Sequence, residues 1–288
     1  MASVELCVDA RATLGESPLW DDLAGRLWWT DILGRRLHYL DHATAATGSV
    51  ATTQELGAIV LRSSGGLVAA ARDGFAVVEE SGGLTMLADV ERDDPANRMN
   101  DGAVDPWGRF WASTMSFKET VGAGSLYRLD EMHQVTRQLG GLTIGNGIDW
   151  SPDRRRMYFV DSATRRVDVI DVDPESGELG ARREFVSVTD GGTPDGLCVD
   201  AEGSVWVAIW GGWAVRAYDT EARQVASIEL PVAHVTSCAF GGPDLDELYV
   251  TSARAGLTAA ELKRQPLAGG LFVATPGARG RPATRYRG

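Results

Sequence analysis

The feature that most constrains the fold is a short pattern that recurs six times along the chain. Each copy has a turn residue, then any residue, then two or more apolar or aromatic residues. The six copies begin at Gly25, Gly66, Gly108, Arg155, Gly203 and Asp246. Successive copies lie roughly 41 to 48 residues apart, the spacing of a four-stranded propeller blade. The repeat predicts an all-β fold: a six-bladed β-propeller with four-stranded antiparallel blades around a central channel.

Further strand signals accompany each copy. A small or apolar stretch such as residues 56–60 precedes the turn, and a stretch ending in an Asp or Gly turn, such as residues 36–41, follows it. Only residues 258–264 could form a helical turn. The composition does not shift along the chain, so we expect one domain over residues 1–288. We expect residues 4–8 to close the ring beside residues 283–287. The alternative is a sandwich or barrel with accidental regularity.

The charge balance excludes several classes of partner. A formal net charge of -12 disfavours nucleic acid and anionic membrane surfaces. No apolar stretch approaches the roughly 20 residues that span a bilayer, and the N-terminus lacks the pattern of a secretory signal. Cys7, Cys198 and Cys238 are too few and too scattered in the sequence for us to expect a disulfide framework or a thiolate metal site. We therefore expect a cytoplasmic protein, with Cys198 and Cys238 as buried small apolar groups.

Residues at equivalent positions of the repeat should meet near the axis of the propeller. Counting back eight or nine residues from each turn gives Glu16, Gly57, Asn100, Asn146, Asp195 and Ser237. Four of these six are acidic or amide residues. Their oxygens suit Ca²⁺, Mg²⁺ or Mn²⁺, and with water ligands also Zn²⁺ or Fe²⁺. The alternative is that each is an ordinary turn former, because Asx-Gly pairs are common in turns.

Several motifs give the chain a family resemblance. They are residues 14–20 (Leu-Gly-Glu-Ser-Pro-Leu-Trp), 97–102 (Asn-Arg-Met-Asn-Asp-Gly), 145–151 (Gly-Asn-Gly-Ile-Asp-Trp-Ser) and 193–196 (Thr-Pro-Asp-Gly). Residues 240–244 and 266–272 match as well. On these motifs the chain resembles the senescence marker protein (regucalcin), gluconolactonase and luciferin-regenerating family of six-bladed propellers. It is closest in character to the bacterial sugar lactonases, and the resemblance covers nearly the whole chain.

The resemblance implies roles for individual residues. The metal ligands of the family correspond to Glu16, Asn146 and Asp195, and Asp195 also corresponds to the proposed general base. Arg98 and Asn100 match residues that bind substrate hydroxyls, and Glu119 falls near another sugar-contacting position. One divalent metal ion is implied, and its identity stays open between Ca, Zn, Mn, Mg and Fe.

The expected function is that of a metal-dependent sugar lactonase. It would hydrolyse an aldonolactone, similar to gluconolactone, xylonolactone or arabinonolactone, to the aldonic acid. A calcium-binding regulatory protein and an organophosphate or aryl-ester hydrolase are the alternatives. The expected partner is the small-molecule sugar lactone, and the protein is expected to be a monomer or a small homo-oligomer. Trp210 either packs in the core or lines the pocket.

Overall fold

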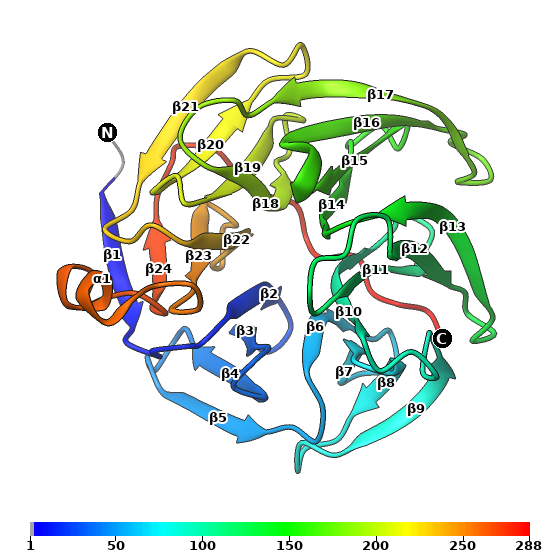
Figure 1. Cartoon of the computed structure of the whole chain (residues 1–288), viewed down its shortest axis with the longest axis horizontal. Helices are drawn as coiled ribbons and strands as arrows, with labels where there is room; N and C mark the ends of the chain where they lie inside the picture. Colours follow the sequence, from blue (N-terminus) through cyan, green and yellow to red (C-terminus); the bar gives the residue numbers. More distant parts are fainter. Residues whose placement is uncertain (1–2) are drawn as a thin grey trace.

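The computed structural model describes residues 3–288 and places their strands in six four-stranded antiparallel sheets around one axis (Figure 1). Blade 1 contains β2 (Gly15–Asp21), β3 (Arg26–Asp31), β4 (Arg36–Asp41) and β5 (Thr47–Ala51). Blade 2 contains β6 (Leu56–Leu61), β7 (Leu67–Ala71), β8 (Gly74–Val78) and β9 (Leu84–Asp89). Blade 3 contains β10 (Asn97–Val104), β11 (Phe110–Ser116), β12 (Gly124–Leu129) and β13 (Val135–Leu142).

The second half of the ring repeats this order. Blade 4 contains β14 (Gly145–Trp150), β15 (Arg156–Asp161), β16 (Arg166–Val172) and β17 (Leu179–Ser187). Blade 5 contains β18 (Thr193–Val199), β19 (Val205–Trp210), β20 (Ala214–Tyr218) and β21 (Gln224–Glu229). Blade 6 contains β22 (Val235–Gly241), β23 (Glu247–Ser252), β24 (Leu271–Ala274) and β1 (Val4–Val8). The predicted six-bladed propeller is confirmed.

The ring closes in blade 6, where the N-terminal strand joins strands from the end of the chain. The strand β1 pairs antiparallel with β24, with Val4 opposite Ala274. The prediction that residues 4–8 close the ring is confirmed, but the predicted partner, residues 283–287, was wrong. The free edge of β24 takes the N-terminal strand, because the chain beyond it turns away beneath the ring.

The last ten residues, 279–288, form a C-terminal segment that crosses the lower end of the channel (red in Figure 1). The segment makes hydrogen bonds to all six blades or to the turns within them. The bonds join Gly280 to Leu245, Arg279 to Ala201, Arg281 to Trp150, Arg285 to Asp21, Tyr286 to Leu61 and Arg287 to Gly108. The segment therefore links the blades across the lower end of the channel.

Apolar side chains fill the spaces between neighbouring sheets. Trp111 of blade 3 meets Trp150 of blade 4 edge to face, with ring centroids 5.9 Å apart. The inner strands are buried on both faces, whereas an outer strand such as β5 alternates between exposed and half-buried residues. This is the pattern expected when only the outermost strand of each blade faces water.

Helical structure is confined to two short elements in residues 3–288. These are α1 (Ala259–Arg264) and the 3-10 turn η1 (Ser162–Thr164). Thr258 and Glu261 form a capping box at the start of α1, which explains the helical turn predicted at 258–264. Neither element approaches the length and apolar character that a membrane-crossing helix requires.

Candidate functional site

The innermost strands carry the site residues at irregularities in their pairing. The pairing register shifts between Glu16 and Leu19 in β2, and between Met99 and Gly102 in β10. Equivalent shifts occur at residues 145–148 of β14 and 194–197 of β18. A bulge re-aims the side chains at that point and bends the strand. The repeated bulges therefore place one polar residue of each strand at the same end of the channel.

Glycines after two of these residues allow neighbouring blades to approach closely. A Cβ atom on Gly147 would lie 2.6 Å from the backbone nitrogen of Leu197, and one on Gly196 would collide with the Ser237 hydroxyl. Neither glycine has a positive φ, so close approach alone explains them. In blade 2, a Cβ on Gly57 would meet the carbonyl oxygen of Asn100. That blade therefore offers no polar side chain at this position.

The upper cavity, which we define by its lining residues, opens at this end of the channel with a volume of about 530 Å³. All six predicted site residues line it: Glu16, Arg98, Asn100, Glu119, Asn146 and Asp195. Its other lining residues are Leu14, Met115, Val121, Thr143, Ile144, Ser162, Ala163, Arg165, Thr193 and Trp210. Which of the six bind metal or substrate remains a prediction.

A hydrogen-bonded network orients the amide groups of the cavity. The Arg98 guanidinium donates to Asn100 Oδ1 at 2.6 Å, and Asn100 Nδ2 donates to Asn146 Oδ1 at 3.1 Å. Asn146 Nδ2 donates in turn to Ser162 Oγ at 2.9 Å. Because its nitrogen donates to Ser162 and its oxygen accepts from Asn100, the Asn146 amide keeps its oxygen on the side of Asn100. Such partners fix the orientation of a metal ligand.

Ser162 is a residue that the sequence did not single out. Its hydroxyl accepts from Asn146 and donates to the carbonyl oxygen of Pro194 at 2.7 Å, so it joins blade 4 to blade 5 beside Asp195. It follows β15 and has no counterpart at the repeat positions that pointed to the other residues. The pairing of β14 with β15, in which Gly145 lies opposite Asp161, brings it beside Asn146.

Two buried carboxylates define the electrostatics of the cavity. Glu16 and Asp195 are 5% and 6% exposed. Burial raises the pKa of both, and the charge of Asp101 raises each further; Asp195 also raises the pKa of Glu16. The charge of Arg98 opposes these shifts. The ionised forms of both carboxyl groups are therefore disfavoured in the empty cavity, and a bound cation would stabilise them.

The chemistry of this donor set fits a divalent cation. It combines the carboxylates of Glu16 and Asp195 with the amide oxygen of Asn146, and Glu16 uses one oxygen to accept from the Ser17 backbone at 3.1 Å. Oxygen donors of this kind suit hard or borderline divalent ions with water completing the shell. Within residues 3–288, no group of three His, Cys, Asp or Glu side chains is placed to hold a metal. The proposed site therefore depends on Asn146.

The remaining polar residues surround this centre. Arg98 is buried, which lowers its pKa to about 10, and its charge persists at neutral pH. Glu119 lies on the connection between β11 and β12, where it is exposed and has a φ of 53°. Trp210 also lines the cavity, and its ring stacks on His234 with centroids 4.0 Å apart. The structure thus places Trp210 in the cavity wall.

Comparisons with known proteins agree with this architecture. A family model described as "SMP-30/Gluconolactonase/LRE-like region" matches residues 14–254. Regucalcin of Xenopus laevis is 40% identical over 99% of this chain and 98% of its own length. A calcium-binding protein, regucalcin, from Agrobacterium tumefaciens strain C58 has a TM-score of 0.95 at 35% identity, covering 99% and 98% of the two chains. A luciferin-regenerating enzyme has a TM-score of 0.93 at 28% identity, covering all of both chains.

Proposed function

Because this chain belongs to the SMP-30/gluconolactonase/LRE-like family, we propose that it is a metal-dependent lactonase that opens a sugar lactone to the aldonic acid. The observation that carries the proposal is the pair of buried carboxylates, Glu16 and Asp195, in one cavity with the oriented amide of Asn146. A lactone is a cyclic ester, so its hydrolysis needs a water nucleophile, a proton acceptor and stabilisation of negative charge on the carbonyl oxygen.

Glu16, Asn146 and Asp195 would hold the divalent ion. When bound there, the ion would polarise the lactone carbonyl and lower the pKa of a nearby water. Asp195 would accept the proton of the attacking water, because its carboxylate lines the same cavity as the oriented amide of Asn146. Its Gly196 neighbour lets the strands of blades 5 and 6 approach closely behind it.

Arg98 and Asn100 would orient the substrate. Arg98 cannot act as an acid or base at neutral pH, since its guanidinium stays charged. It can donate to lactone or hydroxyl oxygens while it holds the Asn100 side chain at 2.6 Å. Two further features favour a sugar. Glu119 supplies a hydroxyl acceptor at the mouth, and Trp210 supplies a flat face for the ring of a small polar molecule.

The test is a pH-stat assay of the purified protein with a panel of aldonolactones, including gluconolactone, xylonolactone and arabinonolactone. We expect turnover with a divalent ion, loss of turnover with excess chelator, and recovery when the ion is restored. An organophosphate and an aryl ester serve as comparison substrates and should react more slowly. Faster turnover of either one would contradict the proposal.

A calcium-binding regulatory role is the second candidate, since a structure similar to this chain is that of a protein called calcium-binding. Both functions use the same cation site, so binding of the ion alone does not separate them. The lactone panel does. Calcium binding without turnover of any lactone, tested with each of the divalent ions Ca, Zn, Mn, Mg and Fe, would favour the regulatory role.

A further inference from the structure

A second chamber lies in the channel below the upper cavity. Ser17, Asp101, Ile148, Cys198 and Ser237 line it, and the C-terminal segment borders it through residues 281–284. Ser17 and Asp101 come directly after the upper-cavity residues Glu16 and Asn100 on the same inner strands. We call this space the lower chamber. It has a volume of about 170 Å³.

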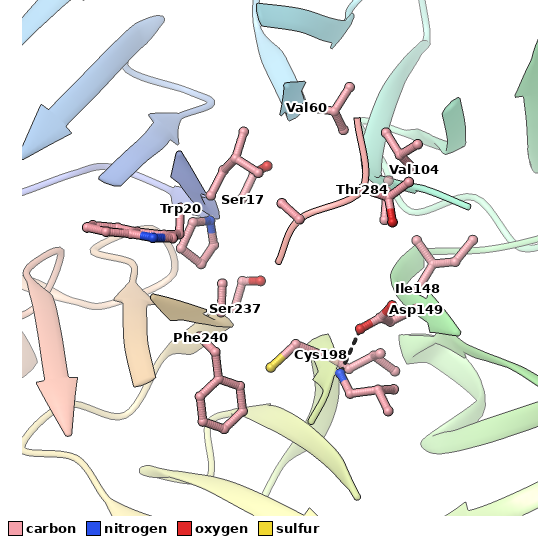
Figure 2. A pocket seen from close by; sticks show the side chains of 18 of the residues that line it. Ser17, Trp20, Val60, Val104, Ile148, Asp149, Cys198, Ser237, Phe240 and Thr284 are labelled. Atoms are coloured by element: carbon pink, nitrogen blue, oxygen red, sulfur yellow. Dashed lines mark hydrogen bonds between the residues drawn. The ribbon is translucent and has the colours of Figure 1, made fainter. Parts of the chain in front are cut away.

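Two cysteines from different blades meet in the wall of the lower chamber. Cys198 lies on β18 of blade 5 and Cys238 on β22 of blade 6, and both line the chamber. Their sulfur atoms are 3.8 Å apart. Figure 2 shows the Cys198 side chain in the chamber, between Asp149 on one side and Ser237 and Phe240 on the other. The thiols are therefore neighbours in space although 40 residues separate them.

Their separation matches one edge of a metal coordination tetrahedron. A thiolate binds Zn²⁺ at about 2.3 Å, so two thiolates in tetrahedral positions stand about 3.8 Å apart. A disulfide requires a separation of about 2.05 Å. At 3.8 Å, Cys198 and Cys238 can bind one ion together without a change of separation, whereas a disulfide would require them to move together.

The surroundings supply room and additional polar contacts. A cavity of 170 Å³ has space for an ion and several waters, each of which occupies about 30 Å³ in the liquid. The hydroxyls of Ser17 and Ser237 and the carboxylate of Asp101 line the same space. The sulfur pair differs from the all-oxygen donor set of the upper cavity. Soft thiolate ligands select thiophilic ions, and carboxylate and amide oxygens select hard ones.

We propose that Cys198 and Cys238 form an inter-blade dithiol site for one thiophilic divalent ion of the Zn²⁺ and Cd²⁺ class. The two sulfur atoms bind the ion, and water molecules in the lower chamber complete its coordination. Each thiol loses its proton to solvent on binding, so one ion replaces two protons and no electron is transferred. The ion would cross-link β18 and β22 three residues beyond Asp195.

Cys198 stays protonated when the ion is absent. The hydrogen bond with Cys238 and burial raise the pKa of Cys198 well above the usual range. Cys198 is therefore a poor nucleophile in the free protein, and we expect it to act in metal binding rather than in attack on a substrate.

Titration with Cd²⁺ tests the proposal, because thiolate-to-metal charge transfer produces an ultraviolet band that oxygen ligands do not. We expect the band to saturate at about one ion per chain. Cys198→Ser and Cys238→Ser should each abolish it, whereas Cys7→Ser should retain it, since Cys7 lies elsewhere, on β1. No band in the wild type, or an equal band in Cys198→Ser, would overturn the proposal.

Two controls separate this site from the upper cavity and from misfolding. Glu16→Gln removes a predicted ligand of the upper cavity and should leave the thiolate band unchanged, whether or not the protein is a lactonase. Loss of the band in Glu16→Gln would contradict an independent dithiol site. Circular dichroism and thermal unfolding of the metal-free serine variants establish folding. Cd²⁺ should raise the unfolding temperature of Cys7→Ser by more than that of Cys198→Ser, and equal shifts would count against the proposal.

Discussion

The two ends of the channel differ in whether their carboxylates form ion pairs with other side chains. At the upper end, Glu16 and Asp195 form no ion pair with another described residue, and Arg98 acts on them only as a neighbouring charge. At the lower end, Asp149 accepts a hydrogen bond from the Val199 backbone at 2.7 Å and pairs with Arg281 at 3.2 Å. The carboxylate at the lower end is paired within the chain, whereas the two buried carboxylates at the upper end have no such partner within residues 3–288. This difference indicates a structural role for the first and a ligand-binding role for the others.

The difference follows from the cost of burying charge. An unpaired buried carboxylate destabilises the fold unless a proton or a cation compensates it. Asp149 at the lower end is compensated within the chain by Arg281 of the C-terminal segment, which also lies across the channel. At the upper end, no side chain in the part of the chain that the structure describes pairs with Glu16 or Asp195, so a bound cation would have to compensate their charge. We therefore expect changes at the upper end to reduce activity and changes at the lower end to reduce stability.

The largest expected effect is that of Asp195→Asn, compared with Asp149→Asn. If Asp195 is both ligand and base, its loss should lower kcat by about 10³- to 10⁴-fold, and the protein should stay folded. Asp149→Asn should keep kcat within about threefold of wild type while lowering stability by about 1–3 kcal/mol, because an amide replaces an ionised acceptor. Lactone turnover and urea unfolding of both variants measure this. If Asp195→Asn and Asp149→Asn lowered kcat equally, the upper and lower ends would not differ in their contribution to activity.

The C-terminal segment should account for the next largest effect. Tyr286 is fully buried, and its hydroxyl donates to the carbonyl oxygen of Asp130 at 2.6 Å. Tyr286→Ala should cost about 3–4 kcal/mol by leaving a cavity, and lower the unfolding temperature by roughly 10 °C. Tyr286→Phe, which removes only the hydroxyl, should cost about 1 kcal/mol. Calorimetry compares the two, and activity per folded molecule should be unchanged. An unchanged unfolding temperature in Tyr286→Ala would show that the segment contributes little to stability.

Asp101, which lines the lower chamber directly after Asn100, gives a pH test of the comparison. Burial raises its pKa from 3.8 to about 6. Its proton is thus held more tightly in the folded chain, so its favourable contribution is fully present below about pH 4 and is lost as the pH rises through about 6. In chelator at about pH 7.5, Asp101→Asn should therefore be more stable than wild type by about 2–3 kcal/mol.

Urea midpoints of Asp101→Asn and wild type at two pH values measure this effect. The difference between them should vanish near about pH 4, where the wild-type carboxyl is protonated. Asp149→Asn is the matched control, because it should be less stable than wild type at the higher pH. A difference between Asp101→Asn and wild type that is the same at both pH values would rule out the charge of Asp101 as its cause.

Much of the fold and part of the site were predictable from the sequence for a physical reason. A propeller repeats one local unit, so consecutive residues of the sequence contain the turn and strand pattern of each blade. Closing the ring then brings equal positions together, which is why Glu16, Asn100, Asn146 and Asp195 line one cavity. The assignment of metal and substrate roles within that cavity came from the family resemblance, not from the repeat.

What could not be predicted depends on contacts between blades. The partner of β1 depends on which strand of blade 6 has a free edge, and that strand is β24. The path of the C-terminal segment depends on its hydrogen bonds to the separate blades. Cys198 and Cys238 are not at equivalent positions of the repeat, since they lie 5 and 8 residues before the turn residues Gly203 and Asp246. Side-chain packing and the bulges set their contact.

The smallest expected effect belongs to the rim of the upper end. Glu119 is exposed on the β11–β12 connection, so a hydrogen bond from a substrate hydroxyl to it competes with water. Glu119→Gln should raise KM about fivefold, roughly 1 kcal/mol, and leave kcat unchanged, because this contact would be as strong in the bound substrate as in the transition state. Lys118→Gln on the same connection is the control and should change neither constant. If Glu119→Gln lowers kcat instead, Glu119 takes part in the chemical step, as Asp195 is proposed to do. If KM is unchanged, the buried Arg98 and Asn100 provide the substrate contacts without Glu119.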